Sequence, residues 1–212
     1  MIKAAEKLPD VPFPDRDERV RMRLRKKEAV LLAAVRMFNQ RGFHASSLED
    51  VATALGITKP VIYHYFGNKD QVLLACVRAG VDQLLDAAEA AKSMPGTGLI
   101  RLREFLRRYA LVTMTDFGRC VVRTGDEMLS PESRLEFRAI KREVDRSLRH
   151  ILEEAVADGS AVVDDIRIAA FALAGALNWP ARWHKHDGPK SVEKTAEDLA
   201  DFLVKALLPR PA

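Results

Sequence analysis

Apolar residues recur at helical spacing along almost the whole chain of 212 residues, and no alternating, strand-like pattern lasts longer than a few positions. In the first helical segment, which starts at Arg19, Val30, Ala34 and Phe38 fall on one side, and Gly42 ends the helix. The pattern predicts an all-α protein of about nine helices. After two short helices, the longer ones are expected at residues 68–93, 99–115, 117–128, 131–157, 165–185 and 191–208.

The stretch SSLEDVATALG predicts the first short helix, which Gly56 ends. Ser46 with Glu49 fits a capping box, in which the two side chains satisfy free backbone N–H groups at the helix start. Ser47 with Asp50 fits the same role one residue later. The sequence leaves both registers open.

The second short helix follows directly, in the stretch TKPVIYHYF. Thr58 is placed to cap it and to accept a hydrogen bond from the Val61 N–H, and Pro60 falls in the first turn, where its missing N–H costs nothing. Ile62 and Phe66 lie four residues apart and are expected to face inward. Two short helices joined by a tight turn that contains glycine are typical of a helix-turn-helix.

The opposite side of this second helix carries Lys59 and Tyr63, with Pro60 and His64 toward one flank. A tyrosine hydroxyl can bond a phosphate oxygen and its ring can pack on a sugar or a thymine methyl, so this face suits double-stranded DNA. Tyr65 falls between the two faces, and the residues alone leave it open between DNA contact and a plug of the domain joint. For His64, a satisfied or merely exposed side chain is the alternative that the residues slightly favour.

Three further side chains stand at helix starts, where free backbone N–H groups attract anions. Ser47 and Lys69 are placed to meet phosphates, at the first short helix and at the helix after the second. Thr58 can reach guanine O6 and N7 in a major groove, as can Lys59. These positions extend the candidate DNA-binding surface beyond the aromatic cluster.

The positive charge of the chain is concentrated in the same region. Between residues 19 and 69 there are 10 lysines and arginines against 3 aspartates and glutamates, whereas the chain beyond residue 70 holds 21 of each. A local basic field attracts polyanions, and its restriction to one segment indicates a binding module on a neutral body. We therefore divide the chain into a flexible leader at 1–18, a helix-turn-helix DNA-binding domain at 19–68 and a ligand-binding and dimerisation domain at 69–212.

The stretch FHASSLEDVATALGITKPVIYHYFGNKDQVLL resembles the DNA-binding segment of the TetR family of bacterial transcriptional regulators. The likeness runs from Gly42 to Leu74 without a gap and includes the small-x-x-G-x-T turn, the Y-H-Y-F run and the N-K-D that follows. The resemblance implies a ligand-controlled repressor that binds operator DNA as a homodimer. It places DNA contacts at Ser47, Lys59, Pro60, Tyr63, Tyr65 and Lys69.

The last two predicted helices are the expected dimer interface, because helix-turn-helix proteins pair on two-fold sites and the resemblance implies a four-helix bundle. The segment IAAFALAGALNW is apolar almost all round, and its small residues allow close approach. In the final helix, one stripe is apolar. The expected interface residues are Ala169, Ala172, Gly175 and Ala176, with Val192, Ala196, Leu199, Leu203, Ala206 and Leu207.

A small-molecule pocket between the middle helices is a further implication of the resemblance. Two stretches, LSPESRLEFRAIKREVDRSLRHILEEAVADG and NWPARWHKHDGPKS, are similar to regulators of fatty-acid or sterol catabolism that respond to acyl-CoA thioesters. Four arginines are placed to meet a CoA phosphate, although a solvated helix face accounts for them more simply. The expected lining residues, each of which also fits core packing, are Met114, Phe117, Val121, Met128, Trp179 and Trp183, and the arginines are Arg103, Arg107, Arg119 and Arg123.

Other classes of protein find little support. There is no nucleophile elbow, phosphate loop or catalytic carboxylate pair, so we expect no enzymatic activity and no cofactor. His184 and His186 hint at a metal, but side chains two residues apart point apart on a helix, so no metal is expected. Cys76 and Cys120 form no disulfide framework, and there is no secretory signal or apolar run of about 20 residues, so a cytoplasmic protein without membrane contact is expected.

The alternatives to a DNA-binding regulator are a protein-binding adaptor that keeps the fold and, with less support, a small helical enzyme. Loss of Tyr63, Lys59 or Lys69 would indicate an adaptor, and all three are present. The sequence names neither the operator nor the effector, and it leaves open whether the protein represses or activates transcription.

Overall fold

The helical pattern of the sequence is confirmed by the computed structural model, which describes residues 15–185 and 187–209. These residues form no strand, and nine of their α-helices have eight residues or more. Residues 1–14 of the expected leader lie outside the described part. The first helix begins at Arg16 and not at Arg19, because the Asp15 side chain caps it by accepting a hydrogen bond from the Glu18 N–H at 2.6 Å. The elements are α1 (Arg16–Arg41), α2 (Leu48–Leu55), α3 (Lys59–Phe66), α4 (Lys69–Lys92), α5 (Gly98–Thr113), α6 (Asp116–Arg123), the 3-10 helix η1 (Asp126–Met128), α7 (Pro131–Ala157), α8 (Ile166–Asn178), the single turn α9 (Pro180–Trp183) and α10 (Val192–Lys205).

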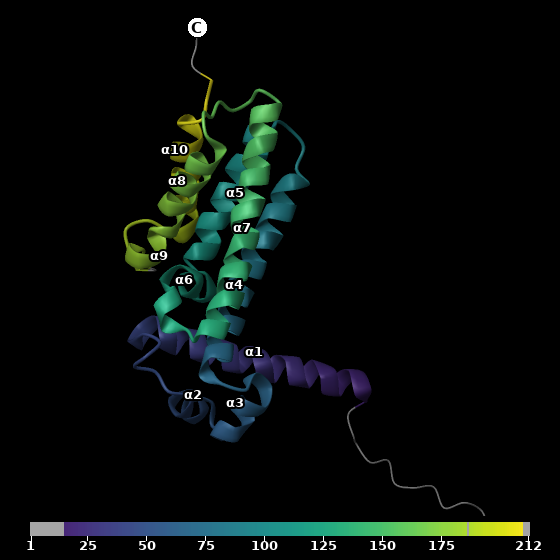
Figure 1. Ribbon diagram of the computed structural model, residues 1–212, viewed down its shortest axis with the longest axis vertical. Coiled ribbons are helices and arrows are strands. Elements are labelled where there is room, and N and C mark those ends of the chain that lie inside the picture. The colour runs from purple at the N-terminus through teal and green to yellow at the C-terminus, as the bar shows by residue number, and fades with distance from the viewer. Residues whose placement is uncertain (1–14, 186, 210–212) are drawn as a thin grey trace, which may run out of the picture.

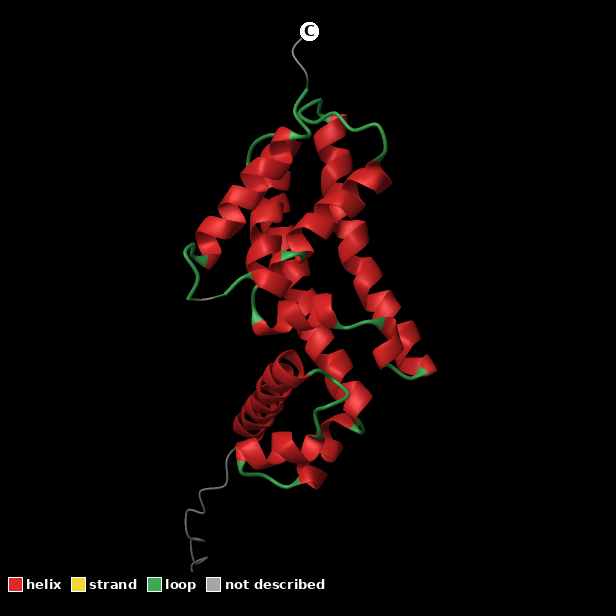
Figure 2. Ribbon diagram, turned by 90° about the vertical axis from the view of Figure 1, so that its left-hand side faces the viewer, coloured by secondary structure: helices red, strands yellow, loops and turns green. Residues whose placement is uncertain are grey.

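The helices form a small N-terminal unit below a tall body (Figure 1). α2 packs beneath α1, which lies across the lower end of the body, and α3 packs on α2 and on the start of α4, which rises from this unit into the body. There α4 packs against α5, α6 and α7, while α8 packs on α7 and α10 runs along α5. Figure 2 shows the same division from the side, with the short helices at the foot of the molecule. α4 is therefore the covalent link between the unit and the body, and α1 packs against both α4 and α6.

Apolar residues from three helices hold the small unit together. Val30, Ala34 and Phe38 of α1 are buried, as their spacing predicts, together with Val51 of α2. Ile62 of α3 is fully buried beneath them. Burial of this side fixes which side of α3 remains available to solvent.

The start of α2 resolves the two registers that the sequence left open. The Ser47 side chain accepts a hydrogen bond from the Asp50 N–H at 3.0 Å, so Ser47 is the cap. The capping box at Ser46 is wrong, because Ser46 is buried and donates its hydroxyl to the Gly42 carbonyl at 2.7 Å. At the other end, Gly56 adopts the left-handed conformation (φ 64°) that ends the helix.

Thr58 stands at the cap position of α3, but the predicted side-chain cap is wrong. The Val61 N–H donates to the backbone carbonyl of Thr58 at 3.0 Å, and the threonine side chain accepts no cap hydrogen bond. The Thr58 hydroxyl is therefore available to an outside partner.

Two long helices of the body are shorter than predicted. The helix expected at 117–128 ends at Arg123, after which Thr124 and Gly125 are extended. The helix expected at 165–185 ends at Asn178, just before Pro180, whose ring cannot continue the hydrogen-bond ladder. Within the described residues, no helix combines the length and the apolar composition needed to cross a bilayer.

Candidate DNA-binding surface and ligand cavity

α3 turns its polar aromatic side to solvent, in the orientation that the sequence predicts. Ile62 is fully buried and Phe66 is half-buried against the core, whereas Tyr63 is 39 % exposed. Pro60 and His64 are exposed on the flank of the same helix. A tyrosine hydroxyl and a basic side chain thus lie on a surface that a groove of DNA can reach.

The Lys59 ammonium on this surface already has a partner. It forms an ion pair with Glu49 of α2 and lies 5.4 Å from the centre of the Tyr63 ring. The hydrogen bond between them lowers the pKa of Glu49 and raises the pKa of Lys59. A base or phosphate that binds Lys59 must therefore compete with the Glu49 carboxylate. Sequence reasoning missed this role because it considered Glu49 only as a helix cap.

Ser47 and Lys69 stand at helix starts, as predicted. Because Ser47 accepts the Asp50 N–H, its own hydroxyl proton remains for a phosphate oxygen. The Lys69 ammonium lies 4.3 Å from the centre of the Phe43 ring, and its partial burial there lowers the pKa of Lys69. Lys69 is the first residue of α4, so its charge adds to the positive end of that helix.

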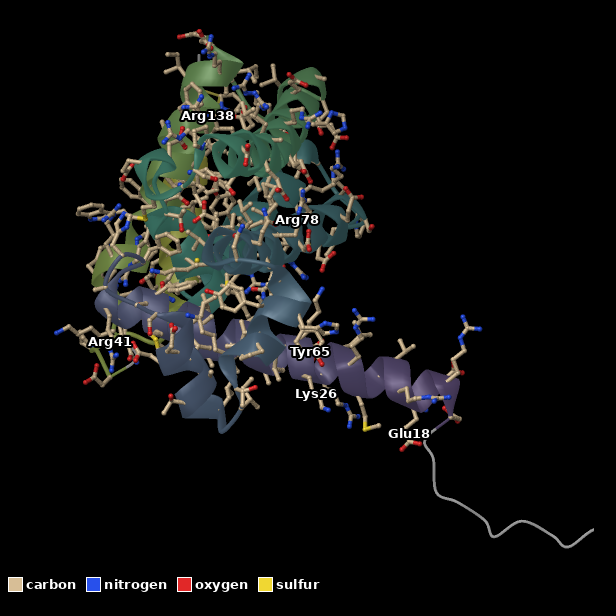
Figure 3. All side chains as sticks on the ribbon, turned by 60° about the horizontal axis from the view of Figure 1, so that its bottom comes forward. Glu18, Lys26, Arg41, Tyr65, Arg78 and Arg138 are labelled. Atoms are coloured by element: carbon tan, nitrogen blue, oxygen red, sulfur yellow. The ribbon has the colours of Figure 1, made fainter. Side chains whose placement is uncertain are left out.

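Tyr65 is half-buried, between the exposed and the buried side of α3. It lines an open groove of about 610 Å³ between α1 and α3, together with Lys26 and His64. Figure 3 shows Lys26 and Tyr65 beside each other where α3 meets α1. Tyr65 and Lys26 therefore border the same groove. The half-buried position of Tyr65 is compatible both with contact to DNA and with packing at the joint between the unit and the body.

The first half of α1 extends beyond the rest of the unit (Figures 1 and 3). Every residue from 16 to 26 is exposed, and the sequence there, RDERVRMRLRK, is rich in arginine. An unpacked helix of this length is marginally stable in water. A polyanion along this segment would neutralise its charge and support the helix.

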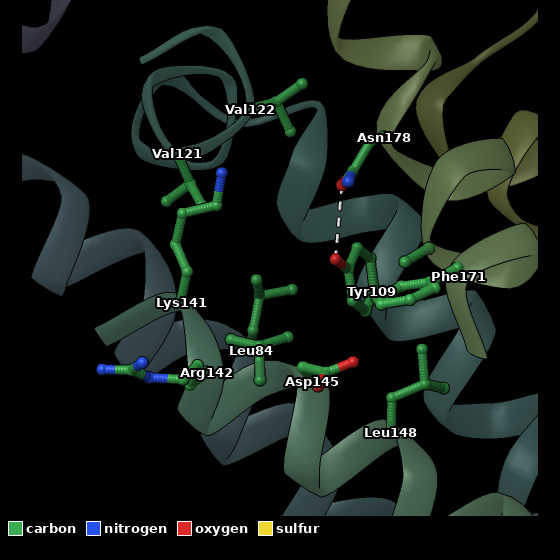
Figure 4. Close-up of a pocket in the computed structure, with 12 residues that line it drawn as sticks. Leu84, Tyr109, Val121, Val122, Lys141, Arg142, Asp145, Leu148, Phe171 and Asn178 are labelled. Atoms are coloured by element: carbon green, nitrogen blue, oxygen red, sulfur yellow. Dashed lines mark hydrogen bonds between the residues drawn. The ribbon is translucent and has the colours of Figure 1, made fainter. Parts of the chain in front are cut away.

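The body contains a cavity of about 390 Å³ between α4, α5, α6, α7 and α8 (Figure 4). Its wall is largely apolar, with Leu84 and Leu148 among the lining residues. The Tyr109 hydroxyl donates to the Asn178 side-chain oxygen at 3.3 Å across one side. Burial raises the pKa of Tyr109 to about 12, so the phenol stays neutral. The cavity can hold an apolar ligand and offers it a small number of polar contacts.

Basic side chains of α7 border the cavity. Lys141 and Arg142 line it beside Asp145, and Figure 4 shows all three on the same helix. The apolar surroundings of Lys141, whose ammonium lies 4.9 Å from the Phe137 ring centre, lower the pKa of this lysine. An anionic group on a ligand would relieve the cost of holding this charge.

Of the six predicted ligand-binding residues, only Val121 lines this cavity. Met114 is enclosed in the core and Phe117 packs against it, while Trp179 and Trp183 are 62 % and 50 % exposed outside. Met128 borders a separate recess next to α1. The residues that sequence reasoning missed, such as Tyr109, Lys141 and Asn178, come from helices that only the packing brings together.

The arginines proposed to meet a CoA phosphate do not line the cavity. Arg103 pairs with Asp201 at 2.6 Å, and Arg107 pairs with Glu104 at 2.7 Å. Their charges are thus balanced within the chain. Arg119 and Arg123 instead donate to backbone carbonyl groups.

Large apolar side chains remain uncovered on α8 and at the end of the chain. Phe171 of α8 is 53 % exposed and Phe202 of α10 is 71 % exposed. The Gly175 position on α8 is open, since a Cβ there would meet no atom of this chain within 4 Å. Part of the stripe predicted on the final helix packs on α5 within the protomer, since Ala196 is fully buried and Leu207 is 8 % exposed, whereas Ala206 is exposed and Val192, Leu199 and Leu203 are half-buried.

Two family models match the chain. Residues 30–76 match the bacterial regulatory proteins of the tetR family. Residues 95–207, more than half of the chain, match a tetracyclin repressor-like C-terminal domain. The first match contains α2, α3 and most of the surface described above.

Relatives match both parts together. The transcriptional repressor KstR2 of Mycolicibacterium smegmatis is 26% identical over 182 residues, which cover 81% of this chain and 85% of that protein. The regulator PfmR of Thermus thermophilus is 31% identical with a TM-score of 0.74, over 85% of this chain and 99% of its own. AibR, solved with isovaleryl coenzyme A and operator DNA, is 25% identical with a TM-score of 0.75, over 88% of this chain and 100% of its own. The chain therefore belongs to the TetR family and is a DNA-binding transcriptional regulator.

Proposed function

We propose that this regulator is a repressor that binds operator DNA through α3 and is released by a small-molecule effector bound in the body. The observation that carries the proposal is the exposed face of Lys59 and Tyr63 on a basic unit that is joined to a body with a largely apolar cavity. The repressor KstR2 is the relative that supports the sign of regulation. The exposed DNA-binding face and the cavity also favour a regulator over an adaptor or an enzyme, and a protein that binds operator DNA acts in the cytoplasm.

The DNA-binding side chains divide into two groups. Lys59 and Thr58 face the major groove at the start of α3 and read base edges. The others contact the sugar-phosphate backbone or neighbouring bases and fix the orientation. This second group comprises Ser47, Pro60, Tyr63, His64, Tyr65 and Lys69.

The dimer forms through α8 and α10. The exposed side chains of Phe171 and Phe202 are the apolar surface that a second copy would cover. Close approach at Gly175 lets two α8 helices pack against each other. Two copies would then present two α3 helices to a two-fold operator.

The effector is an amphipathic molecule, with an acyl-CoA thioester as the leading candidate. The acyl chain would fill the apolar cavity, whose volume of about 390 Å³ leaves the larger CoA group outside beside Lys141 and Arg142. The complex of AibR with isovaleryl coenzyme A supports this class of ligand. The exposed Trp179 and Trp183 remain candidates for the outer part of such a ligand.

Ligand and DNA are coupled through α6. This helix supplies Val121 and Val122 to the cavity wall, and its first residue contacts α1. The Asp116 carboxylate pairs with Arg36 at 3.0 Å, and its carbonyl accepts a hydrogen bond from the Asn39 side chain at 2.8 Å. A ligand that favours another position of α6 would therefore change the separation of the two α3 helices, and DNA affinity would fall by the difference in affinity between the two states.

A binding assay on the DNA upstream of the gene tests this function. The purified protein is titrated against that DNA in a gel shift, with and without acyl-CoA thioesters and with free CoA as the matched control. We expect a shift that acyl-CoA removes and free CoA leaves in place. No shift under any condition would contradict the DNA-binding proposal, and a shift that no acyl-CoA affects would contradict the effector class.

A further inference from the structure

A recess smaller than the ligand cavity lies where the DNA-binding unit meets the body. It has a volume of about 210 Å³ and lies between the end of α1, the following loop, α4, α6 and α9. Phe38, Phe43 and Met128 contribute apolar wall, and Arg123 and Arg182 contribute charge. None of its lining residues is shared with the larger cavity. The two spaces can therefore bind ligands separately.

The charge around this recess is unbalanced. Arg123 donates to the Asn39 carbonyl at 3.1 Å and to the Ala181 carbonyl at 2.9 Å, and the nearby Arg119 donates to another backbone carbonyl. Within the described residues, no carboxylate forms an ion pair with either arginine or with Arg182. Burial, and then the charges of Arg119 and Arg182, lower the pKa of Arg123. The carbonyl groups at helix ends offset only part of this charge.

We propose that this junction recess binds a small organic carboxylate with a short apolar body. The carboxylate would bind Arg123 and Arg182, because a planar guanidinium matches a carboxylate with two parallel hydrogen bonds. The apolar part would lie against Phe38, Phe43 and Met128. The volume equals that of roughly seven liquid waters, which suits a molecule the size of benzoate.

Occupancy of the recess joins two parts of the molecule. Phe38 and Phe43 belong to the DNA-binding unit, whereas Arg123 and Arg182 belong to the body. Figure 1 shows α6 and α9 above the end of α1 from which the chain continues to α2. A carboxylate there would fix the unit against the body and would change DNA affinity, a consequence that rests on the proposed function.

Calorimetric titration of the full chain with sodium benzoate and sodium phenylacetate tests the site. Benzyl alcohol is the neutral control of similar shape. Arg182→Gln is the informative variant, because Arg182 is exposed and its side chain makes no hydrogen bond within the described chain. Lys141→Gln, in the larger cavity, reports whether the probe binds there instead.

We expect saturable binding of at least one carboxylate, weakened about tenfold or more by Arg182→Gln and unchanged by Lys141→Gln, with no binding of benzyl alcohol. Absence of saturable binding would overturn the site. Binding that only Lys141→Gln removes would overturn it too, without affecting the proposal for DNA. In a second titration on upstream DNA, an affinity that saturating benzoate leaves unchanged would overturn the coupling.

Discussion

Neutralising Glu49 tests whether the surface of α3 meets DNA, because this carboxylate holds the Lys59 ammonium in the unbound protein. In Glu49→Gln, Lys59 loses its charged partner, and one negative charge disappears from the proposed DNA surface. We therefore expect tighter binding to upstream DNA and a steeper dependence of affinity on salt.

The size of the effect follows from counterion release. Each phosphate that the protein neutralises multiplies the association constant by a factor that depends on the salt concentration to the power of about −0.9. With the salt concentration in mol per litre, this factor is roughly eightfold at 0.1 M and roughly twofold at 0.5 M. Once free of Glu49, the Lys59 ammonium would neutralise nearby phosphate charge as well as reach a base edge, so Glu49→Gln gains up to this factor per protomer. A dimer gains up to its square, and the slope of log K against log salt steepens by about 1.8.

Fluorescence anisotropy of labelled upstream DNA at four salt concentrations measures both quantities. Glu89→Gln is the matched control, because Glu89 also pairs with a lysine, Lys92 at 2.8 Å, but on the upper part of α4. The double variant Glu49→Gln/Lys59→Ala should lose most of the gain in DNA affinity that Glu49→Gln alone produces. If Glu49→Gln binds no better than Glu89→Gln and has a parallel salt dependence, the Lys59–Glu49 surface does not contact DNA.

Four other changes test separate parts of the structure. Lys69→Ala should weaken binding to all DNA sequences in the same titration and reduce the salt slope by about 0.9 per lost phosphate contact, and an unchanged slope would exclude that contact. Lys59→Ala should relax base preference at one operator position by roughly tenfold, measured by competition with single-base variants, and equal weakening at all sites would contradict base reading. Gly175→Leu should give monomers in light scattering, with exposed Val162→Leu as control, and an unchanged dimer would refute the interface. Glu104→Gln should destabilise the fold by roughly 1–3 kcal/mol at pH 7, because hydrogen bonds from Arg107 and then Arg108 lower the pKa of Glu104 to about 2. Urea titrations should show the full difference in unfolding free energy between Glu104→Gln and the parent protein at pH values above about 4.5, the pKa of Glu104 in the unfolded chain. The difference should shrink as the pH falls toward 2, and a difference that does not depend on pH would contradict this explanation.

The exposed face of α3 could be predicted from sequence because it depends on the spacing of residues within one short helix. Ile62 and Phe66 are the inward positions of α3, so they determine which side of this eight-residue helix faces outward. Gly56 ends the helix before it, and Gly67 ends α3 itself. The partner of Lys59 could not be predicted in this way, because Glu49 lies on another helix and reaches Lys59 only through the packing of α2 on α3.

The body was predictable only as a set of helices. The cavity depends on which side of each long helix faces the centre, and several of these helices are apolar on more than one side. On α10, both the stripe with Ala196 and the side with Phe202 look suitable for an interface, and only packing on α5 separates them. Likewise, Trp179 and Trp183 are spaced for one helical face, but Pro180 interrupts that helix and both rings are exposed.

The claim that α3 binds DNA is tested most directly by photocrosslinking. A photoreactive benzoylphenylalanine replaces Tyr63 in one protein and the exposed Val162 in another, and each is irradiated with labelled upstream DNA. Val162 belongs to the segment that joins α7 to α8, which lies at the end of the body away from α2 and α3 (Figure 1). We expect a crosslink from position 63 that unlabelled upstream DNA competes away, and none from position 162. Equal crosslinking from both positions, or none from position 63 to DNA that the protein binds, would contradict the claim.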